Sequence, residues 1–272
     1  MGAVDYIPFA TDVALEAGSI LMRHYLRVSV EYKGAFDTVT AADRAAERFV
    51  VGRIRAQFPS HAIVAEEGGS YEGDGEFIWY VDPLDGTTNF SHGLGRFCVS
   101  IGLWSRGEGL MGVVYDPLHN DLYAAESGSG AYLNRRRIRV SEQADFERGL
   151  FATGFPSSIR GTNPNLHYFH QVAMVTHGVR RTGSAALDLC SVAQGHFEGF
   201  WEIGLKPWDV GGGLVILSEA GGSYCDFDGG EYSPGDERMV ATNGQVTAEL
   251  LQLFAEVTRG EHRVSIPAIT RA

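Results

Sequence analysis

The chain has 272 residues, of which 44% are hydrophobic, and its formal net charge is −12. This length is enough to bury a large core, either in one big domain or in two fused lobes. A protein this acidic is a poor general binder of nucleic acid or of anionic membranes. If it handles anionic ligands, it needs a cation between its own carboxylates and the ligand.

The sequence indicates a reduced, cytosolic protein. Its cysteines, Cys98, Cys190 and Cys225, are odd in number and far apart, which argues against a disulfide framework. Residues 1–10 lack the basic start and long apolar core of a signal peptide. No apolar run reaches the length of a membrane span. We therefore expect a cytoplasmic location.

The first half of the chain predicts two helices and then a series of strands. Residues 6–25 place small and apolar side chains on one helical face. Residues 40–58 predict a second helix that Pro59 ends. Loops are expected at 33–37 and 68–75. Strand-like apolar runs occur at 62–65, 77–81, 97–104, 110–115 and 122–125.

Residues 134–140 carry an arginine run, namely Arg135, Arg136, Arg137 and Arg139. The simpler interpretation is a surface hairpin turn, because a short run of like charges is usually a solvated face. The alternative is a basic patch that binds a partner.

The second half alternates helices and strands more regularly. Helices are predicted at 165–176, 184–194, 208–220 and 246–257, and Ser184 is a candidate N-cap for the second of them. Strands are predicted at 178–181, 197–201, 223–227 and 239–241. Mixed elements in both halves predict a layered α/β sandwich. No Pro- or Ser-rich linker divides the chain, so one compact unit is expected.

The most informative segment is Asp82-Pro83-Leu84-Asp85-Gly86-Thr87-Thr88, directly after the predicted strand 77–81. Carboxylates at the end of a strand are hard oxygen ligands of the kind that Mg²⁺ prefers. Backbone amides in a Gly-Thr turn can point at a phosphate. The segment therefore predicts metal-assisted chemistry on a phosphate ester.

Other acidic residues are candidates for the same site. Asp43 lies in the first turn of the helix at 40–58, Glu66 and Glu67 follow a strand, and Asp209 begins a helix. Taken singly, each has a simpler explanation as a helix cap or a solvated charge. The nine histidines show no zinc spacing such as HExxH, which fits oxygen ligation, so each is interpreted as structural or surface.

On these residues the sequence resembles the inositol monophosphatase family of Mg²⁺-dependent, lithium-sensitive phosphatases. The resemblance covers roughly residues 7–253 and rests on ordered signatures. They are 37–40 with Asp43, then Glu66-Glu67-Gly68, then 79–90, and finally Trp208-Asp209 before a Gly-rich helix.

The resemblance implies a layered α-β-α-β-α sandwich of the sugar-phosphatase type. Residues 1–145 would form a metal- and phosphate-binding lobe and residues 146–260 a lobe that completes the substrate site. Residues 261–272 would be a tail, for which no role is predicted. A homodimer and inhibition by Li⁺ are also implied.

The same resemblance implies the metal ligands. Glu66, Asp82 and the carbonyl of Leu84 would hold a first Mg²⁺. Asp82, Asp85 and Asp209 would hold a second. A third, weaker Mg²⁺ would lie near Glu66, which is therefore also assigned to catalysis.

Catalytic and substrate-binding roles are implied as well. Thr87 and Asp43 would orient and deprotonate the attacking water, and the amides of Gly86 and Thr87 would bind phosphate oxygens. The residues that would meet the hydroxyls of the alcohol are Asp85, Gly183, Ser184, Ala185, Glu202 and Asp209.

The leading hypothesis is hydrolysis of myo-inositol 1-phosphate to inositol and phosphate by in-line attack of an activated water. Relatives with the same motif act on fructose 1,6-bisphosphate, 3′-phosphoadenosine 5′-phosphate, NADP or histidinol phosphate, and these stay open as alternatives. A further alternative is a transcription-regulating binding protein of the same fold.

The chain departs from the family pattern in two places. Gly211-Gly212-Gly213 stands where relatives usually carry alanine, and each glycine in a helix costs about 1 kcal/mol relative to alanine. This weakens the expected rigidity of the helix that Asp209 begins. Asn134-Arg135 replaces the usual Asn-Gly of a hairpin turn.

Overall fold

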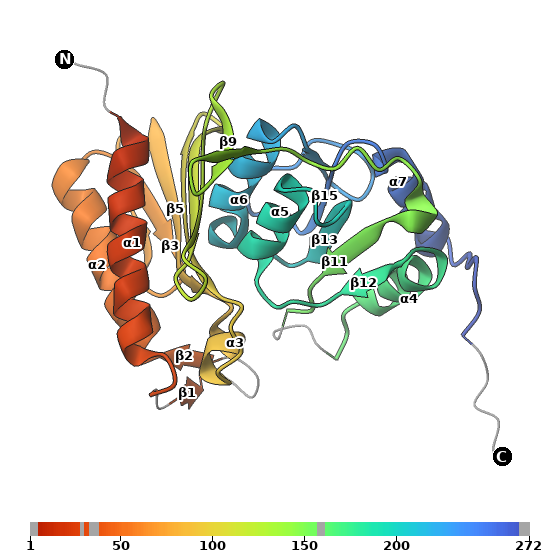
Figure 1. The fold of residues 1–272 in the computed structure, drawn as a ribbon, viewed down its shortest axis with the longest axis horizontal. Helices are drawn as coiled ribbons and strands as arrows, with labels where there is room; N and C mark the ends of the chain where they lie inside the picture. The colour runs from red at the N-terminus through yellow and green to blue at the C-terminus, as the bar shows by residue number, and fades with distance from the viewer. Residues whose placement is uncertain (1–4, 28–29, 33–37, 157–160, 267–272) are drawn as a thin grey trace.

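The computed structural model describes residues 5–27, 30–32, 38–156 and 161–266, with the side chains of 30–32 and 38–40 left out. The predicted loop at 33–37 lies outside the described residues. Helices and sheets alternate in layers across the molecule (Figure 1). In order, the layers are α1 (Tyr6–His24) with α2 (Ala41–Gln57), a large sheet, α5 (Ala185–Ala193) with α6 (Pro207–Glu219), a small sheet, and α4 (Asn165–Val175) with α7 (Thr247–Thr258). The predicted layered sandwich is confirmed.

The large sheet has eight strands in the order β10-β9-β8-β7-β6-β5-β3-β4. It is antiparallel except where β3 runs parallel to β5. Its strands are β3 (Ala62–Ala65), β4 (Gly69–Tyr71), β5 (Phe77–Asp85), β6 (Cys98–Ser105), β7 (Glu108–Asp116), β8 (Asp121–Glu126), β9 (Gly130–Leu133) and β10 (Arg136–Ile138).

Strand β4 corrects the predicted loop at 68–75. Gly69 has a φ of 79°, which only glycine adopts without strain, and it turns the chain back along β3. Ala65 then pairs with Gly69, and Ile63 pairs with Tyr71. The polar sequence of β4 gave no strand signal because this edge strand is mostly exposed.

The small sheet has five strands in the order β12-β11-β13-β15-β14. They are β11 (Leu150–Thr153), β12 (Gly178–Arg180), β13 (Gly199–Ile203), β14 (Ser223–Cys225) and β15 (Arg238–Thr242). The predicted strand at 197–201 is therefore displaced by two residues, and β11 was not predicted. A further pair of short strands, β1 (Val30–Tyr32) and β2 (Thr38–Thr40), precedes α2.

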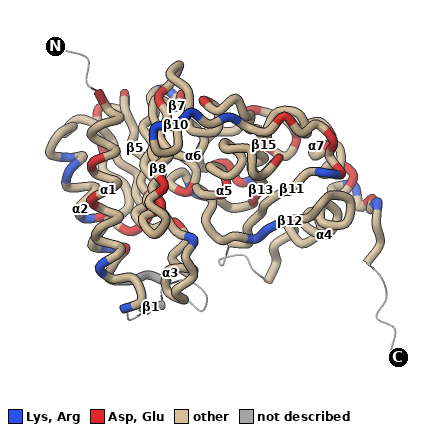
Figure 2. Tube along the Cα trace, in the orientation of Figure 1, with Lys and Arg blue, Asp and Glu red and all other residues tan. Residues whose placement is uncertain are grey.

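The arginine run forms the predicted hairpin between β9 and β10. Asn134 and Arg135 have φ values of 48° and 67°, the left-handed pair that a tight hairpin turn requires. Arg135 therefore adopts a conformation that glycine usually supplies. All four arginines of the run are exposed, and Figure 2 shows basic positions at β10.

The described part of the tail folds back onto the last helical layer. The side chain of Gln171 donates to the carbonyl of Val264 at 2.7 Å and accepts from its amide at 3.1 Å. Arg263 pairs with Glu256 of α7, with Nε and Oε2 2.6 Å apart. These contacts attach residues 263–264 to both α4 and α7.

The described residues agree with the expected absence of cross-links. Cys98 and Cys190 are buried thiols and Cys225 is half-buried, and all of them are free. Within the described ranges, no helix has the length and apolarity needed to cross a membrane.

Glycines let α6 lie directly on the large sheet. A Cβ on Gly102 of β6 would lie 2.4 Å from the carbonyl carbon of Gly211, and one on Gly112 of β7 would lie 2.2 Å from the oxygen of Gly212. Trp104 Nε1 donates to the carbonyl of Gly211 at 2.9 Å. Because the backbone of the sheet faces the backbone of α6 here, an added side chain could be accommodated only by shifting the helix or the strands. The glycines of α6 therefore have a packing role.

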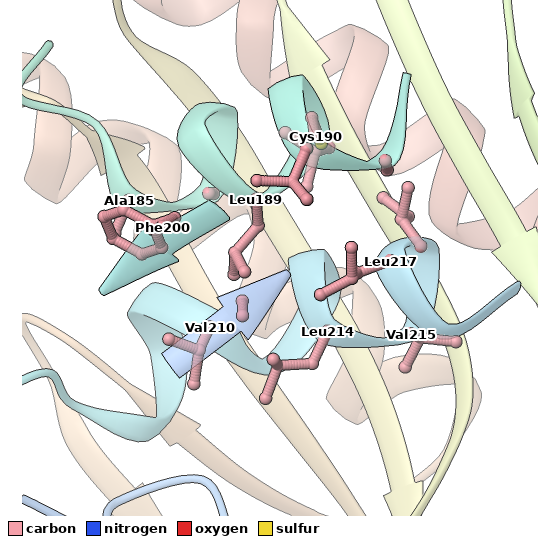
Figure 3. Packing of buried hydrophobic residues seen from close by; sticks show 14 of the residues in the cluster. Ala185, Leu189, Cys190, Phe200, Val210, Leu214, Val215 and Leu217 are labelled. Atoms are coloured by element: carbon pink, nitrogen blue, oxygen red, sulfur yellow. The ribbon is translucent and has the colours of Figure 1, made fainter. Parts of the chain in front are cut away.

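The opposite side of α6 packs on α5 (Figure 3). Leu214 and Leu217 of α6 and Leu189 of α5 are buried in one apolar cluster. A Cβ on Gly213 would lie 2.9 Å from the Cβ of Leu189, so this contact is also close. The middle layer is thus held tightly from both sides.

His61 is half-buried and stacks between aromatic rings beside α1. Its ring stacks on Phe58 and Phe77 with centroids 5.0 and 4.5 Å away. Trp79 Nε1 donates to His61 Nδ1 at 3.0 Å, which requires a neutral imidazole at that nitrogen. Burial lowers the pKa of His61 below its ordinary value of 6.5, although Asp74 and Glu76 oppose this.

We expect Gly102→Ala to lower the free energy of unfolding by about 1–3 kcal/mol, because the added methyl group overpacks the contact with α6. The matched control is Gly52→Ala, since Gly52 is an exposed residue of α2 with nothing near its Cβ position. The control should be neutral or stabilise by up to about 1 kcal/mol. Urea unfolding of both variants measures the difference, and equal effects would contradict the close packing.

We expect His61 to make the protein less stable in mild acid. The unfolded state takes up the proton more readily than the folded state, so stability falls as the pH drops below the unfolded value of 6.5. Between about pH 7.5 and about pH 5.5, the melting temperature should fall less in His61→Phe than in the wild type. His196→Phe, which replaces an exposed histidine, should keep the wild-type slope. If the melting temperature of His61→Phe depends on pH as steeply as that of the wild type, His61 is not the group that destabilises the protein in acid.

Candidate active site

Strand β5 carries both acids of the central motif. The strand was predicted to end at Val81, but it continues to Asp85, with Asp82 opposite Ser100 and Asp85 opposite Cys98. The register shifts between the two acids, where Pro83 has no N–H to donate to a neighbouring strand. The backbone of the sheet, and not a free turn, therefore holds both carboxylates.

Asp82 is the centre of a cluster of acids. Its side chain is only 2% exposed, and its Oδ1 accepts from the amide of Leu84 at 3.0 Å. Burial raises its pKa well above the usual range, and the charges of Glu66, Asp85 and Asp209 raise it further. Acids from distant parts of the sequence thus lie close enough to Asp82 to raise its pKa.

Asp85 is held by the start of α5. Its Oδ2 accepts from the hydroxyl of Ser184 at 2.6 Å and from the amide of Ala186 at 2.8 Å. Burial raises the pKa of Asp85, and these hydrogen bonds oppose that shift. Ser184 also caps α5, as predicted, by accepting from the amide of Leu187 at 3.4 Å. One serine therefore fixes both the helix start and the acid.

Thr87 and Asp43, to which the resemblance assigns the attacking water, lie within hydrogen-bond distance of each other. Thr87 Oγ1 lies 3.0 Å from Asp43 Oδ1 and 3.0 Å from the carbonyl oxygen of Leu84, so the hydroxyl can donate to either. Asp43 is fully buried in the first turn of α2. A hydroxyl that donates to a carboxylate keeps lone pairs free to accept a hydrogen bond from water.

Gly86 sits where the motif turns away from β5. Its φ of 94° is left-handed, and a Cβ there would lie 2.8 Å from the carbonyl oxygen of Arg96. The expected Gly-Thr turn continues as a short helix, α3 (Thr87–Ser91). Gly86 therefore sets the direction from which Thr87 approaches Asp43.

Glu47 is a supporting residue that the sequence analysis missed. It is 5% exposed, and its Oε2 accepts from the amide of Glu67 at 2.7 Å. It thereby holds the turn that carries Glu66. The signal was present, because Glu47 lies four residues after Asp43 and residues at this spacing share one face of a helix.

Asp209 and Glu202 approach the cluster from the second half of the chain. Asp209 Oδ2 accepts from the amide of Lys206 at 2.7 Å, and burial raises its pKa to about 7. Glu202 is buried on β13, and its pKa is raised well above the usual range by burial and then by Asp209, Asp188 and Asp85. Its carboxylate occupies the space beside Gly154, where a Cβ would lie 2.0 Å from Oε2.

The predicted Gly183-Ser184-Ala185 segment lies beside the central motif. Gly183 has a φ of 86°, and a Cβ there would lie 3.0 Å from Asn89 Nδ2. Ala185 is buried, and its amide lies close enough to Asp85 to help lower that pKa. The segment therefore reaches the acid cluster through Asp85.

The donor set suits a hard divalent cation, although the acids do not converge on one point. In residues 5–266 with the gaps given above, no group of three or more His, Cys, Asp or Glu side chains is placed to hold a metal ion. Asp82, Asp85 and Asp209 instead accept hydrogen bonds from the amides of Leu84, Ala186 and Lys206. Their mutual repulsion and oxygen chemistry nevertheless fit Mg²⁺, which would neutralise the cluster.

Comparisons with known proteins point to one family. A profile of the "Inositol monophosphatase family" matches residues 4–259. The inositol-1-monophosphatase of Synechocystis sp. is 42% identical over 254 residues, covering 92% of this chain and 88% of that protein. The Pseudomonas aeruginosa protein named Nus factor SuhB is 42% identical over 251 residues, covering 89% and 93%.

A solved structure is also similar. The inositol monophosphatase from Anabaena (Nostoc) sp. matches with a TM-score of 0.82 and 41% identity, covering 91% of this chain and 94% of that one. The profile, the Synechocystis relative and the solved structure all carry the name inositol monophosphatase, and each match spans most of the chain. The chain therefore belongs to the inositol monophosphatase family.

Proposed function

We propose that this protein hydrolyses a small phosphate monoester, with myo-inositol 1-phosphate as the first candidate substrate. Membership of the family supports a phosphatase. The observation that carries the proposal is the hydrogen bond between Thr87 and Asp43 beside the buried acid cluster around Asp82. A water-activating pair next to clustered oxygen ligands suits attack of water on a phosphate.

The acid cluster is the proposed cation site, since the family is in general Mg²⁺-dependent. The proposed ligands are Glu66, Asp82, the carbonyl of Leu84, Asp85 and Asp209. Bound Mg²⁺ would lower the pKa of a water and stabilise charge on the leaving oxygen. The number of ions stays a prediction.

The proposed proton path begins at Thr87. Its hydroxyl accepts a hydrogen bond from the attacking water while it donates to Asp43, so the water is oriented toward phosphorus. As the water attacks, its proton passes to Thr87 Oγ1 while the hydroxyl proton moves to Asp43. The amides of Gly86 and Thr87 are proposed to bind phosphate oxygens, which fixes the phosphate for in-line displacement.

The proposed alcohol site lies between Ser184, Glu202 and Asp209. A carboxylate can accept hydrogen bonds from two neighbouring hydroxyls, which suits a polyol such as inositol. Burial and the nearby Asp209, Asp188 and Asp85 raise the pKa of Glu202, and hydroxyl donors from the substrate would offset the cost of burying its ionised carboxylate. Gly183, Ala185 and Asp85 are proposed to complete this surface. Fructose 1,6-bisphosphate, 3′-phosphoadenosine 5′-phosphate, NADP and histidinol phosphate stay alternative substrates.

A second function is favoured by one comparison. A relative at 42% identity is named a Nus factor, which points to a transcription-related binding role. The exposed arginines of the β9–β10 hairpin are the local feature that would suit an acidic partner. The overall charge of −12 disfavours direct contact with RNA.

Several other expectations stay predictions. They are the division into a lobe at 1–145 and a lobe at 146–260, the homodimer, and the cytoplasmic location. Each is consistent with membership of the family, and each needs its own measurement.

We expect Thr87→Val to lower kcat by about 10²–10⁴-fold, because it removes the hydroxyl that passes a proton to Asp43. The KM and the Mg²⁺ concentration for half-maximal activity should change little, since no proposed ligand is lost. Thr88→Val is the matched control, because Thr88 is the adjacent, exposed threonine of α3.

Steady-state kinetics of both variants test this prediction, and a wild-type kcat in Thr87→Val would remove Thr87 from the mechanism. If the protein also binds a transcription partner, Thr87→Val should keep that binding while losing phosphatase activity. Loss of both together would indicate a damaged fold.

A substrate panel tests the proposed function directly. With Mg²⁺, we expect the highest kcat/KM for myo-inositol 1-phosphate among the five esters named above, and inhibition by millimolar Li⁺ because the expected second-metal acids are all present. Phosphate release is the measurement. If the wild type releases phosphate from none of these esters, the proposed function is wrong; full activity in Li⁺ at limiting Mg²⁺ would contradict only the lithium prediction.

A further inference from the structure

Arg96 connects the large-sheet side of the site to α5. It lies on the segment between α3 and β6, and the sequence analysis assigned it no role. Its Nη2 donates to Asp188 Oδ1 at 3.2 Å, to Ser191 Oγ at 2.9 Å and to the carbonyl of Leu187 at 3.2 Å. One guanidinium nitrogen is therefore placed among three acceptors of the first two turns of α5.

Asp188 is the buried partner of Arg96. It is 2% exposed, and its Oδ1 also accepts from Thr182 Oγ1 at 2.5 Å. Burial raises its pKa to about 7, while Thr182 and Arg96 oppose that shift. Arg96 is partly exposed, but removing it would leave the buried carboxylate of Asp188 without its cationic partner, so this contact constrains both segments.

Asn89 ties the same two segments together a second time. Its Nδ2 donates to the carbonyl of Arg96 at 2.8 Å and to the carbonyl of Thr182 at 2.9 Å. Asn89 belongs to α3, directly after the central motif. The backbone at Arg96 and the backbone at Thr182 are thus held at a fixed separation next to the site.

The connection continues to Asp85 through the start of α5. Ser184 and Ala186, which donate to Asp85, precede Asp188 in the same first turn of the helix. A shift of that turn would therefore move both donors. The Arg96 guanidinium also lies close enough to Asp85 to lower its pKa.

The same helix borders the element that carries Asp209. α5 packs against α6 through Leu189, and α6 begins two residues before Asp209 (Figure 3). The position of α5 therefore bears on Asp85 directly and on Asp209 through packing. These residues come from opposite halves of the chain.

We propose that Arg96 is a positioning residue, which clamps α5 to the large sheet through Asp188 and so holds the donors of Asp85 in place for cation binding. This inference rests on the proposed function, because it takes Asp85 as a ligand of Mg²⁺. Partners that orient metal ligands in this way typically change metal affinity by about 10–100-fold when they are removed.

The test measures Mg²⁺ binding to the full chain by calorimetry, together with kcat and KM. Arg96→Met keeps the aliphatic stem and removes every hydrogen bond of the guanidinium, and it should raise the Kd for Mg²⁺ by about 10-fold or more. We expect kcat at subsaturating Mg²⁺ to fall while the KM for the ester changes little. Arg96→Lys keeps the charge without the planar group and should fall between Arg96→Met and wild type.

Arg106→Met is the matched control. Arg106 is exposed, and its ion pair with Glu76 spans 3.6 Å at the surface, so Mg²⁺ binding should stay at the wild-type value. If Arg96→Met does not fold, Asp188→Asn gives the second test, since it weakens the same ion pair while keeping an oxygen for Thr182. It should also raise the Kd for Mg²⁺.

The outcomes separate this inference from the proposed function. A lower melting temperature with an unchanged Kd for Mg²⁺ in Arg96→Met and in Asp188→Asn would overturn it and show a merely structural pair. A wild type that binds no Mg²⁺ would overturn it as well. If the wild type binds Mg²⁺ but releases phosphate from no ester, the proposed function fails while the binding test of Arg96 still decides this inference.

Discussion

The crowding of several acidic side chains around the buried Asp82 is the constraint on which the rest of the structure depends. Asp82 has a pKa raised by burial and by Glu66, Asp85 and Asp209, so this cluster opposes folding when its acids are ionised. The protein offsets part of that cost with hydrogen-bond donors on several acids, such as the amides of Leu84 and Ala186. Strongly perturbed acids in one place are typical of functional sites.

The middle helical layer brings the acids together. Asp82 and Asp85 lie at the end of β5 of the large sheet, whereas Asp209 lies in the first turn of α6, which is between the two sheets (Figure 1). Glycine-to-glycine contact lets α6 approach the large sheet closely, and α5 fills the space on its other side. A bulkier interface would separate Asp209 from β5. Close backbone packing next to Asp209 therefore helps to set the geometry of the site.

Much of the fold could be predicted because its signals are local. Helical periodicity found α1 and α2, and Ser184 was recognised as a cap from its place before an apolar run. Strand β4 and the displacement of β13 were missed, because a short polar edge strand and the bounds of a strand depend on pairing partners. Arg96 was missed for a related reason, since an isolated charged residue in a loop shows nothing of what it will contact, whereas Glu47 was missed although its spacing from Asp43 places both on one helical face.

The sequence by itself determined the class of chemistry. Asp82, Asp85 and Thr87 lie within one short segment, so their spacing follows from the local backbone and is visible before folding. Only the tertiary structure decided what holds each acid. The donors to Asp85 lie 99 and 101 residues further along the chain. The Glu47 carboxylate, which holds the turn that carries Glu66, lies 20 residues before the Glu67 amide that donates to it. Such partners meet only when the sheets and helices pack, because contacts at that separation depend on the whole fold.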